Sequence, residues 1–417
     1  MALIDVQRVT KIFGPRPGDA LARVQSGLSK EALLAETGHT LGLHDISLAI
    51  DRGEIFVIMG LSGSGKSTLI RHFNRHIDPT AGRIVVDGTD IMELSEAELR
   101  RFRRQRTSMV FQRFGLLPHR TVLDNVAYGL KVQGQEAKAR RAVALEWIDA
   151  VGLKGFEKQF PSQLSGGMQQ RVGLARALAT DADILLMDEA FSALDPLIRS
   201  QMQDQLLELQ NRLHKTIVFI THDLDEALRI GDRIAILKDG RLSQVGTPPQ
   251  ILLNPADDYV RAFVRDVNRA RVLTVESVMR PPSLRITSDD LDHALAELRR
   301  QGANYGYVVA DDGYRGVVTQ QAVEQALATG NATTTVADAT EAQPSLGPED
   351  TLERALPMTL ECDYPVAVVD REGDLKGTVS RTQMGNVLNI QTPNPPAAPG
   401  FEAIPEAAAT EARRRAS

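Results

Sequence analysis

The stretch from Gly60 to Thr68, GLSGSGKST, constrains this chain more than any other feature. It follows the apolar run EIFVIM and precedes LIRHFNRHI, so it lies at a turn from a strand to a helix. In that context the spacing G-x-x-x-x-G-K-[ST] forms a phosphate-binding loop, because backbone N–H groups and the positive helix N-terminus face the anion. The alternative is an ordinary glycine-rich loop, which gives no reason for the strand, the lysine and the serine to occur together.

The residues of this loop have different tasks in holding a nucleoside triphosphate. The glycines let the backbone wrap closely around the phosphates, Lys66 reaches the β- and γ-phosphates, and Ser67 supplies a hydroxyl to Mg²⁺. The residues predicted to bind the nucleotide are Gly60, Ser62, Gly63, Ser64, Gly65, Lys66, Ser67 and Thr68.

Polar residues end or follow three other apolar runs. DILLMDE ends in Asp188 and Glu189, and we expect Asp188 to hold Mg²⁺ and Glu189 to activate a water molecule. FITHD contains His222, which is expected to hold the γ-phosphate and the attacking water, although a single histidine at a strand end is more often structural. Gln112, in MVFQRF, offers an amide to both metal and water, and taken alone it is a weak signal.

Three kinds of sequence follow one another along the chain. Short β-rich runs alternate with helical stretches over residues 1–268, which predicts an α/β domain with a largely parallel sheet. Residues 272–390 contain a repeat, since YVVADDGYRGVVT resembles AVVDREGDLKGTVS, with Gly316 and Gly377 61 residues apart. The segment 391–417 is rich in Pro and Ala and is predicted to be disordered.

Composition indicates the compartment. No apolar run approaches the ~20 residues of a membrane-spanning helix. The N-terminus MALIDVQRVTKIF lacks the basic and then apolar pattern of a secretory signal, so we expect the chain to stay in the cytosol. Its single cysteine, Cys362, excludes an internal disulfide and a cysteine-based metal cluster.

The octamer LSGGMQQR, Leu164 to Arg171, places a serine and two glycines before the helical-looking stretch VGLARALA. Exposed backbone N–H groups and a positive helix end there would suit a second phosphate. Taken alone, the octamer is better explained as a helix N-cap with permissive glycines.

The order of these motifs resembles that of the ABC-type nucleotide-binding domain over roughly residues 1–265. In that family the lysine loop, a glutamine, an LSGG-type stretch, the Asp-Glu strand, SALD and a histidine follow one another as they do here. The resemblance implies an α/β P-loop domain that binds ATP and carries a helical subdomain at about residues 113–181.

The resemblance also implies that LSGGMQQR is the family's signature motif, which contacts ATP held by a second, facing subunit. Ser165, Gly166 and Gly167 carry over to it, whereas Met168 stands where the family commonly has glutamine. One chain has one lysine loop and one signature, so a homodimer would close head to tail around two ATP molecules.

Three further positions take their expected roles from the same resemblance. Asp195 of SALD falls on the cross-dimer loop. Phe13 of VTKIFG falls on the aromatic residue that stacks on adenine, with a packed core phenylalanine as the alternative. The surface around Gln112 and the following residues 113–130 would contact a partner permease.

The subfamily follows from longer stretches. An insertion separates KIFG from the lysine loop, and LLMDEAFSALDPLIR and the surrounding motifs look like ATPase subunits of quaternary-amine importers, from Val9 to about Ile390. This implies an ATPase that energises import of glycine betaine, proline betaine or choline. Its partners would be a transmembrane permease and, indirectly, an external substrate-binding protein, with no nucleic acid. The chain would lie peripherally on the cytoplasmic face of the inner membrane.

Four other functions are compatible with parts of the sequence. They are the ATPase of another ABC importer class, an exporter subunit, a cytosolic ABC ATPase working on ribosomes or DNA, and a sensor with an inactive ATPase. A fused membrane domain and a second cassette, which would favour the exporter and the cytosolic ATPase, are both absent from this sequence. The residues needed for hydrolysis are all present, which argues against the inactive sensor.

The repeated region resembles paired cystathionine-β-synthase (CBS) regulatory domains, a smaller α+β module at about 272–330 and 335–390. Nucleotide-binding copies commonly have an aspartate for the ribose three residues after the Thr or Ser of GxxT. Here Ala322 follows Thr319 and Gln383 follows Ser380 at that spacing. The missing aspartates argue against ribose-type binding of AMP or ATP. The alternatives are that the module senses another ligand, responds to salt or only stabilises the dimer.

A last feature is the basic stretch SEAELRRFRRQR. Ser95 and Glu98 predict a capping box at a helix start, and five arginines follow between Arg100 and Arg106. The simple interpretation is a solvated basic helix. The alternative hypothesis is that the cluster binds anionic lipid and senses ionic strength, because each such charge near a membrane contributes about 1 kcal/mol that salt screens.

Overall fold

The computed structural model describes residues 2–111, 115–192, 194–329 and 334–388. The chain divides into two compact units, Met1–Val267 and Asn268–Ser417. Within the described ranges no helix has both the length and the apolar character to cross a bilayer. The predicted disordered tail, 391–417, lies outside the described residues, and so does Gln112.

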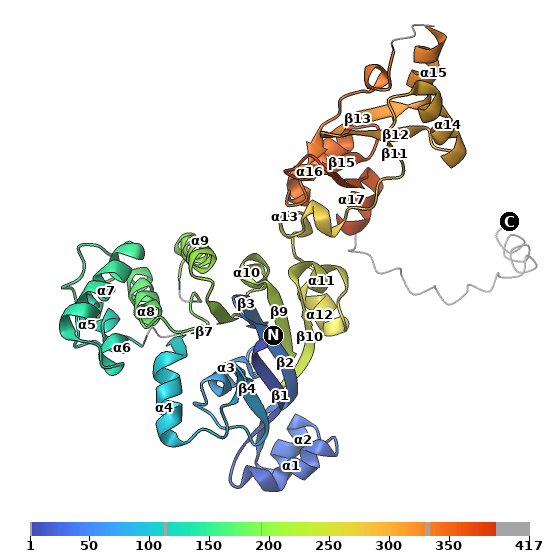
Figure 1. Cartoon of the computed structure of the whole chain (residues 1–417). Coiled ribbons are helices and arrows are strands. Elements are labelled where there is room, and N and C mark those ends of the chain that lie inside the picture. Colours follow the sequence, from blue (N-terminus) through green and yellow to red (C-terminus); the bar gives the residue numbers. More distant parts are fainter. Residues whose placement is uncertain (1, 112–114, 193, 330–333, 389–417) are drawn as a thin grey trace, which may run out of the picture. The chain divides into compact units, whose positions relative to one another are not determined.

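Six strands form the central sheet of the first unit, in the order β10-β9-β3-β8-β7-β6 (Figure 1). Only β10 runs antiparallel to its neighbour, which confirms the largely parallel α/β sheet. Every residue of β3, β7 and β8 is buried, because continuous apolar runs suit parallel strands covered on both faces. The strands are β3 Ile55–Met59, β6 Thr107–Val110, β7 Ile184–Asp188, β8 Thr216–Ile220, β9 Arg233–Lys238 and β10 Arg241–Gly246.

A second, antiparallel sheet has the order β2-β1-β4-β5. Its inward residues and those of the central sheet share one hydrophobic cluster, in which Ile4 and Ile84 meet Phe56 and Phe73. The strands are β1 Ala2–Phe13, β2 Thr40–Asp51, β4 Ala81–Val86 and β5 Thr89–Asp90.

Helices cover the central sheet. The first of them, α3, starts at Lys66 directly after the glycine-rich loop and adds Leu69 and Phe73 to the shared cluster. These helices are α3 Lys66–Phe73, α9 Pro196–Leu213, α10 Leu224–Ile230, α11 Pro248–Leu253 and α12 Asp258–Phe263.

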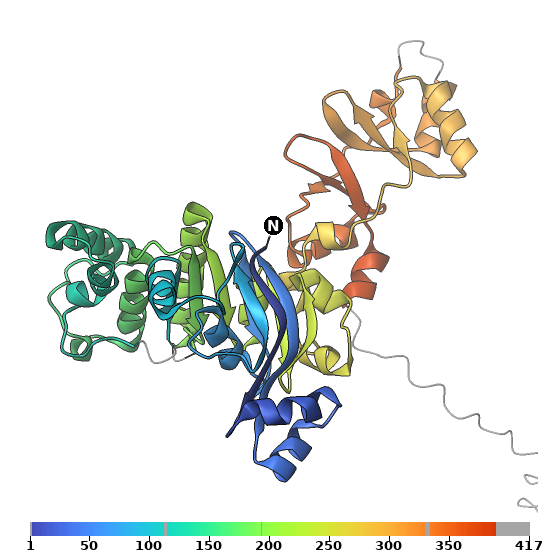
Figure 2. The same ribbon diagram turned by 60° about the horizontal axis from the view of Figure 1, so that its bottom comes forward.

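A group of four helices forms a separate layer with its own core. Its apolar residues, among them Val126, Ile148 and Val172, form a hydrophobic cluster distinct from that of the sheets. Figures 1 and 2 show this group at one end of the central sheet, where α8 contacts β6. The helices are α5 Val122–Val126, α6 Tyr128–Val132, α7 Ala137–Ala150 and α8 Gly166–Ala179.

The insertion after Phe13 folds as two short helices, α1 Pro17–Gln25 and α2 Lys30–Thr37. They lie at the tip of the β1–β2 hairpin, away from the α5–α8 group (Figure 2). Their apolar sides pack on the ends of the two strands in a small cluster of Ile12, Ala20, Val24, Leu33 and Leu41.

The basic helix is α4, Glu96–Gln105, and its predicted capping box is confirmed. Glu98 N–H donates to Ser95 Oγ at 3.4 Å, and Ser95 N–H donates to Glu98 Oε2 at 2.9 Å. Both ends of the box are exposed, so it satisfies helix N–H groups without burying them.

The five arginines of this stretch have different surroundings. Arg103 and Arg106 are partly buried because they contact carbonyls and carboxylates of the same chain, and Arg100 pairs with an acid one turn earlier. Arg101 and Arg104 are exposed. Any lipid contact of this helix therefore depends mainly on these two residues, and the salt-sensing hypothesis stays a prediction.

The second unit contains the same element order twice. In each half a short strand is followed by a helix, two antiparallel strands and another helix. Gly316 pairs with Val308 in one half and Gly377 pairs with Val368 in the other, so the repeated glycines hold equivalent places. The elements are β11 Arg285–Ile286, α14 Leu291–Gln301, β12 Tyr305–Ala310, β13 Gly313–Thr319 and α15 Gln320–Ala328, then β14 Ser345–Leu346, α16 Leu352–Glu361, β15 Val366–Val369, β16 Leu375–Val379 and α17 Arg381–Leu388, all preceded by α13 Arg269–Val272.

The two halves are packed against each other through their sheets. Tyr307, fully buried, donates its hydroxyl proton to the carbonyl of Pro365 at 2.8 Å. The hairpin tips touch so closely that a Cβ on Gly313 would lie 2.5 Å from the carbonyl oxygen of Gly373.

Candidate active site

The loop between β3 and α3 includes two glycines that have no room for a side chain. Gly60 has a φ of 146°, and a Cβ there would lie 2.2 Å from the carbonyl oxygen of Leu237. Gly65 has a φ of 103°, and its Cβ would lie 2.6 Å from the carbonyl oxygen of Gly42. Any other residue would be strained and would displace backbone, so these glycines keep the loop tight against the neighbouring segments.

Lys66 is only 5% exposed and donates to the carbonyl of Gly60 at 2.8 Å and to that of the following residue at 3.1 Å. Burial lowers the pKa of Lys66, while Glu189 and Asp188 act in the opposite direction. The hydroxyl of Ser64, in the same loop, is buried and has no hydrogen-bond partner. A buried cation and an orphaned hydroxyl are groups that a phosphate would satisfy.

Asp188 at the end of β7 lies against the start of α3. Ser67 Oγ donates to Asp188 Oδ1 at 2.9 Å, and the Arg71 guanidinium lies 3.5 Å from Oδ2. A hydroxyl oxygen and a carboxylate oxygen on adjacent elements are ligands of the kind Mg²⁺ prefers. The sequence reasoning did not identify Arg71, although its place one turn after Ser67 on a helix could have suggested it.

Glu189 and His222 come together from the ends of β7 and β8. His222 Nδ1 lies 3.7 Å from Glu189 Oε1. The Glu189 backbone has a φ of 46°, and its N–H donates to the carbonyl of Ile220 at 3.1 Å. Left-handed backbone angles are strained for a glutamate, and such strained residues are found more often at functional sites than elsewhere. Gln112, expected beside them, lies outside the described residues.

The LSGG segment takes the N-cap position that its local sequence favours. Ser165 Oγ accepts the backbone N–H three residues on at 3.3 Å, and Gly166 faces open space. A Cβ on Gly167 would lie 2.9 Å from Ile198 of α9, whose N–H donates to Asp195 Oδ1 at 3.0 Å. No hydrogen bond or ion pair among the described residues joins this segment to the lysine loop of its own chain.

Phe13 at the end of β1 is not a packed core residue. It is 39% exposed, and Lys11 Nζ lies 5.2 Å from its ring centroid. Gly42, whose carbonyl lies against the lysine loop at Gly65, is so close to the ring that a Cβ there would lie 2.6 Å from it. The ring is therefore exposed near the loop that would hold the phosphates.

Two contacts with the loop come from distant segments that the sequence reasoning missed. Tyr259 of α12 accepts the N–H of Leu61 at 3.4 Å. Lys30 of the insertion donates to the carbonyl of Gly63 at 3.3 Å. Neither residue belongs to a motif, so no sequence signal pointed to it.

A groove of about 430 Å³ lies between α4, β6, α6 and α8, and Phe111 and Gly115 are among the residues that line it. Phe111, Tyr128 and Val132 are all between 37% and 40% exposed there, and Arg103 and Arg176 line it as well. This is the surface around residues 113–130 where a permease contact was predicted.

In the second unit the positions expected for a ribose contact form helix caps. Thr319 Oγ1 accepts the N–H of Ala322 at 3.0 Å. Gln383 Oε1 accepts the N–H of Ser380 at 2.6 Å, and Ser380 Oγ accepts the N–H of Gln383 at 3.2 Å. The Gln383 side chain is thus engaged within its own helix start.

A family model described as "ABC transporter" matches residues 43–192. The glycine betaine transport ATP-binding protein OpuAA of Bacillus subtilis is 48% identical over 380 residues, covering 91% of this chain and 90% of that protein. The glycine betaine/proline betaine transport system ATP-binding protein ProV of Escherichia coli is 54% identical over 310 residues, 73% of this chain and 78% of that protein.

Among solved structures, the ATP-binding cassette MJ0796, in a dimeric post-hydrolysis state bound to ADP and Pi, matches with a TM-score of 0.51. It is 33% identical and covers 59% of this chain and 98% of that chain. The similarity covers a share of the chain comparable to the first unit, in which the lysine loop, Asp188 and His222 all lie.

Proposed function

Because the chain belongs to the ATP-binding subunits of ABC transporters, in the group that includes OpuAA and ProV, we propose that it energises import of quaternary ammonium solutes. Glycine betaine, proline betaine and choline are the proposed substrates of the transporter. The observation that carries this proposal is the 48% identity over 91% of the chain, and it is supported by the approach of Ser67 to Asp188 and of His222 to Glu189 at one edge of the sheet.

In the proposed reaction, ATP is held by the lysine loop and hydrolysed at its γ-phosphate. Lys66 turns from the loop carbonyls to the β- and γ-phosphates, and the loop N–H groups bind the remaining oxygens. Glu189 accepts a proton from the attacking water, and His222 orients that carboxylate and the γ-phosphate. Phe13 stacks on the adenine, which its exposure near Gly42 supports.

The site is proposed to use Mg²⁺, which neutralises charge between the β- and γ-phosphates when bound. Ser67 and Asp188 would hold it, and Gln112 is proposed as a third ligand. The fit rests on the Ser67–Asp188 contact of two oxygen atoms at 2.9 Å.

Cassettes of this family dimerise and work with permease subunits. We propose that two copies of this chain close head to tail, so that Ser165, Gly166 and Gly167 of one copy reach ATP on the lysine loop of the other. The absence of a described bond between this segment and its own lysine loop is compatible with that arrangement. Asp195 is proposed to face the partner copy, since it starts α9 where Gly167 packs.

The groove between α4, β6, α6 and α8 is proposed as the docking site of the permease. Its exposed Phe111, Tyr128 and Val132 provide apolar contacts. The subunit would then lie peripherally on the cytoplasmic membrane face, with a substrate-binding protein acting on the other side. Residues 272–390 are proposed to be a tandem CBS module that regulates the dimer, supported by the repeated element order.

The proposal is tested by reconstituting the chain with its permease and substrate-binding protein in vesicles. Uptake of labelled glycine betaine and of labelled choline is measured with ATP on the side of the ATPase subunit, and labelled methionine serves as a negative control. ATP-dependent uptake of at least one quaternary amine, lost in Glu189→Gln, is expected. Uptake of methionine without either amine would assign the chain to another importer class.

A further inference from the structure

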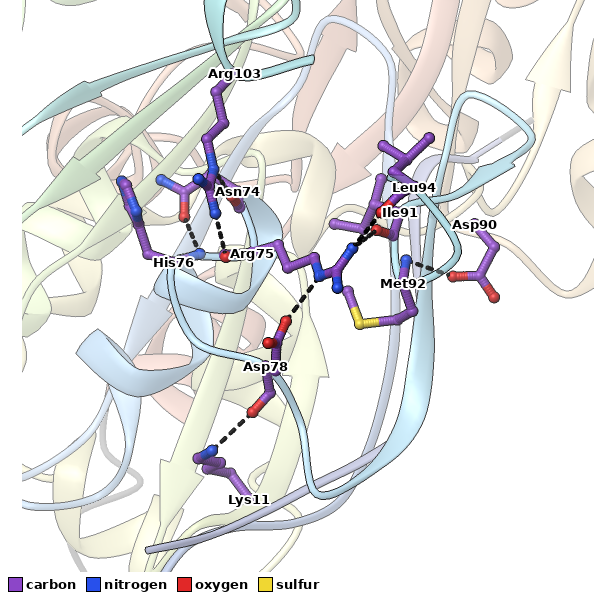
Figure 3. A network of polar contacts seen from close by, with 10 residues as sticks. All are labelled: Lys11, Asn74, Arg75, His76, Asp78, Asp90, Ile91, Met92, Leu94 and Arg103. Atoms are coloured by element: carbon purple, nitrogen blue, oxygen red, sulfur yellow. Dashed lines mark hydrogen bonds and ion pairs between the residues drawn. The ribbon is translucent and has the colours of Figure 1, made fainter. Parts of the chain in front are cut away.

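Arg103 joins the basic helix α4 to the end of α3. Its Nε donates to the carbonyl of Asn74 at 2.9 Å, and its terminal nitrogen donates to the carbonyl of Arg75. These carbonyls belong to the first two residues after α3, the C-cap Asn74 and the following Arg75, where the chain leaves the helix. Figure 3 shows the Arg103 guanidinium facing this turn.

The same turn is held from the opposite side by the side chain of Arg75. Arg75 Nε donates to Asp78 Oδ1 at 2.7 Å. Its Nη1 donates to the carbonyls of Ile91 and Leu94 at 3.1 and 2.8 Å (Figure 3). Arg75 itself has a φ of 50°, an unfavourable conformation for a residue with a side chain. The turn after α3 is therefore fixed in one conformation, because Arg103 contacts it on one side and the Arg75 side chain anchors it on the other.

A second contact links this turn to the groove. Asn74 is 3% exposed, and its Nδ2 donates to the sulfur of Met109 at 3.6 Å. Met109 and Arg103 both line the groove that is proposed to receive the permease. Two walls of the groove, from α4 and from β6, thus contact the residues that end α3.

The other end of α3 carries Lys66 and Ser67. The helix has eight residues, so only about 12 Å separates the turn from the phosphate-binding loop. A short, packed helix moves as a rigid element, and displacement at one end is carried to the other.

We propose that Arg103 is a positioning residue that transmits occupation of the groove by the permease to α3 and so to the lysine loop. This rests on the proposed function, because it requires a permease in that groove. The planar guanidinium is suited to the task, since it bridges two carbonyls at once, which a lysine ammonium does not do in a fixed geometry.

The test uses the assembled transporter and compares ATPase turnover with and without transported substrate. Arg103→Gln is expected to lower the ratio of stimulated to unstimulated turnover at least about fivefold. Arg103→Lys should give an intermediate ratio. Arg100→Gln, the same substitution at an exposed arginine of the same helix whose side chain pairs with Glu96, should keep the ratio within about twofold of the wild type.

Two results would overturn the proposal. An Arg103→Gln ratio equal to that of Arg100→Gln would show that Arg103 has no role in transmission. A loss of both turnover rates at a constant ratio, with a lower melting temperature, would make Arg103 a purely structural residue.

A separate variant distinguishes failure of this inference from failure of the docking assignment. Val132→Glu changes the groove without touching α3, and it should reduce co-purification with the permease. Normal assembly and stimulation of Val132→Glu would show that the groove is not the docking site, and the role of Arg103 would fall with it. Impaired Val132→Glu with a normal Arg103→Gln would reject only the inference about Arg103.

Discussion

His222 Nδ1 lies 3.7 Å from Glu189 Oε1, and these two residues come just after two neighbouring parallel strands, Glu189 after β7 and His222 after β8. The glutamate has left-handed backbone angles, so its carboxylate is directed by the turn after β7 as well as by its own rotamer. Asp188, the preceding residue, contacts Ser67 instead. The two adjacent acidic residues thus face different partners. This arrangement suits Asp188 to the metal and Glu189 to the attacking water.

Glu189→Gln is expected to leave ATP binding intact and to reduce turnover by about 10²–10⁴-fold, because the phosphate loop remains while the proton acceptor is lost. The variant should accumulate as an ATP-bound dimer. Steady-state ATPase assays and gel filtration with ATP measure both effects. Near wild-type turnover together with a monomer in ATP would contradict the role of Glu189.

Mixing Lys66→Ala chains with Ser165→Arg chains should restore ATPase activity that neither variant has alone. A mixed dimer contains one site with an intact lysine loop and an intact signature, so an equal mixture should recover roughly a quarter of wild-type activity. Turnover is measured across mixing ratios, with differently tagged chains to quantify mixed dimers. The head-to-tail arrangement is wrong if mixed dimers form and remain inactive.

His72→Gln should make the first unit less sensitive to acid. His72 is fully buried on α3, and desolvation by burial lowers its pKa to about 4. In the unfolded chain the pKa of a histidine is about 6.5, so below that pH the unfolded chain binds a proton that the folded chain does not bind. The contribution of His72 to the free energy of unfolding is therefore fully present above about pH 6.5 and is lost as the pH falls toward 4. Between pH 7 and pH 5 this histidine accounts for roughly 2 kcal/mol of lost stability.

Urea denaturation at pH 7 and pH 5, followed by fluorescence of Trp147, measures this effect. Trp147 is the single tryptophan of the chain and lies on α7, so it reports on the first unit. The exposed His119→Gln serves as the control and should keep the wild-type dependence. Equal pH dependence in His72→Gln and His119→Gln would mean that His72 does not carry the effect.

Gly313→Ala should destabilise the second unit by about 2 kcal/mol or more, because the added Cβ meets the Gly373 carbonyl and the φ of 115° is unfavourable. Gly302→Ala is the matched control, since Gly302 has a φ of 63° but open space around it, and it should cost only about 1 kcal/mol. Hydrogen exchange of amides in residues 273–388 in urea gives both values. Equal losses of unfolding free energy in the two variants would show that the hairpin tips can move apart to accept the added Cβ at no energetic cost.

The parts of the site that could be predicted from sequence are those whose geometry is local. The lysine loop lies between a buried strand and a helix, and both elements are evident from the residues on either side of it. Asp188 and Glu189 end a run of buried residues, so their place at the carboxyl edge of a parallel sheet follows from the run itself. Ser165 as an N-cap is a similar case.

The contacts that sequence did not predict depend on how distant segments approach. Tyr259 reaches Leu61 across 198 positions, and Arg103 reaches the turn after α3 because α4 packs beside it. The strain at Arg75 and Glu189 is likewise imposed by surroundings, since neither residue type favours a positive φ. Periodicity and motif spacing carry no information on such approaches.

The insertion of residues 14–39 begins after Phe13 and ends before Thr40, and these two residues are cross-strand partners. Its two ends therefore lie side by side, on a hairpin whose register is set by the strands below it. Evolution can therefore add or remove such a segment as one unit, because a short turn between Phe13 and Thr40 would close the hairpin and leave the strands in place. Relatives with and without these helices would then share the same sheet and differ only in this two-helix insertion at the tip of the hairpin.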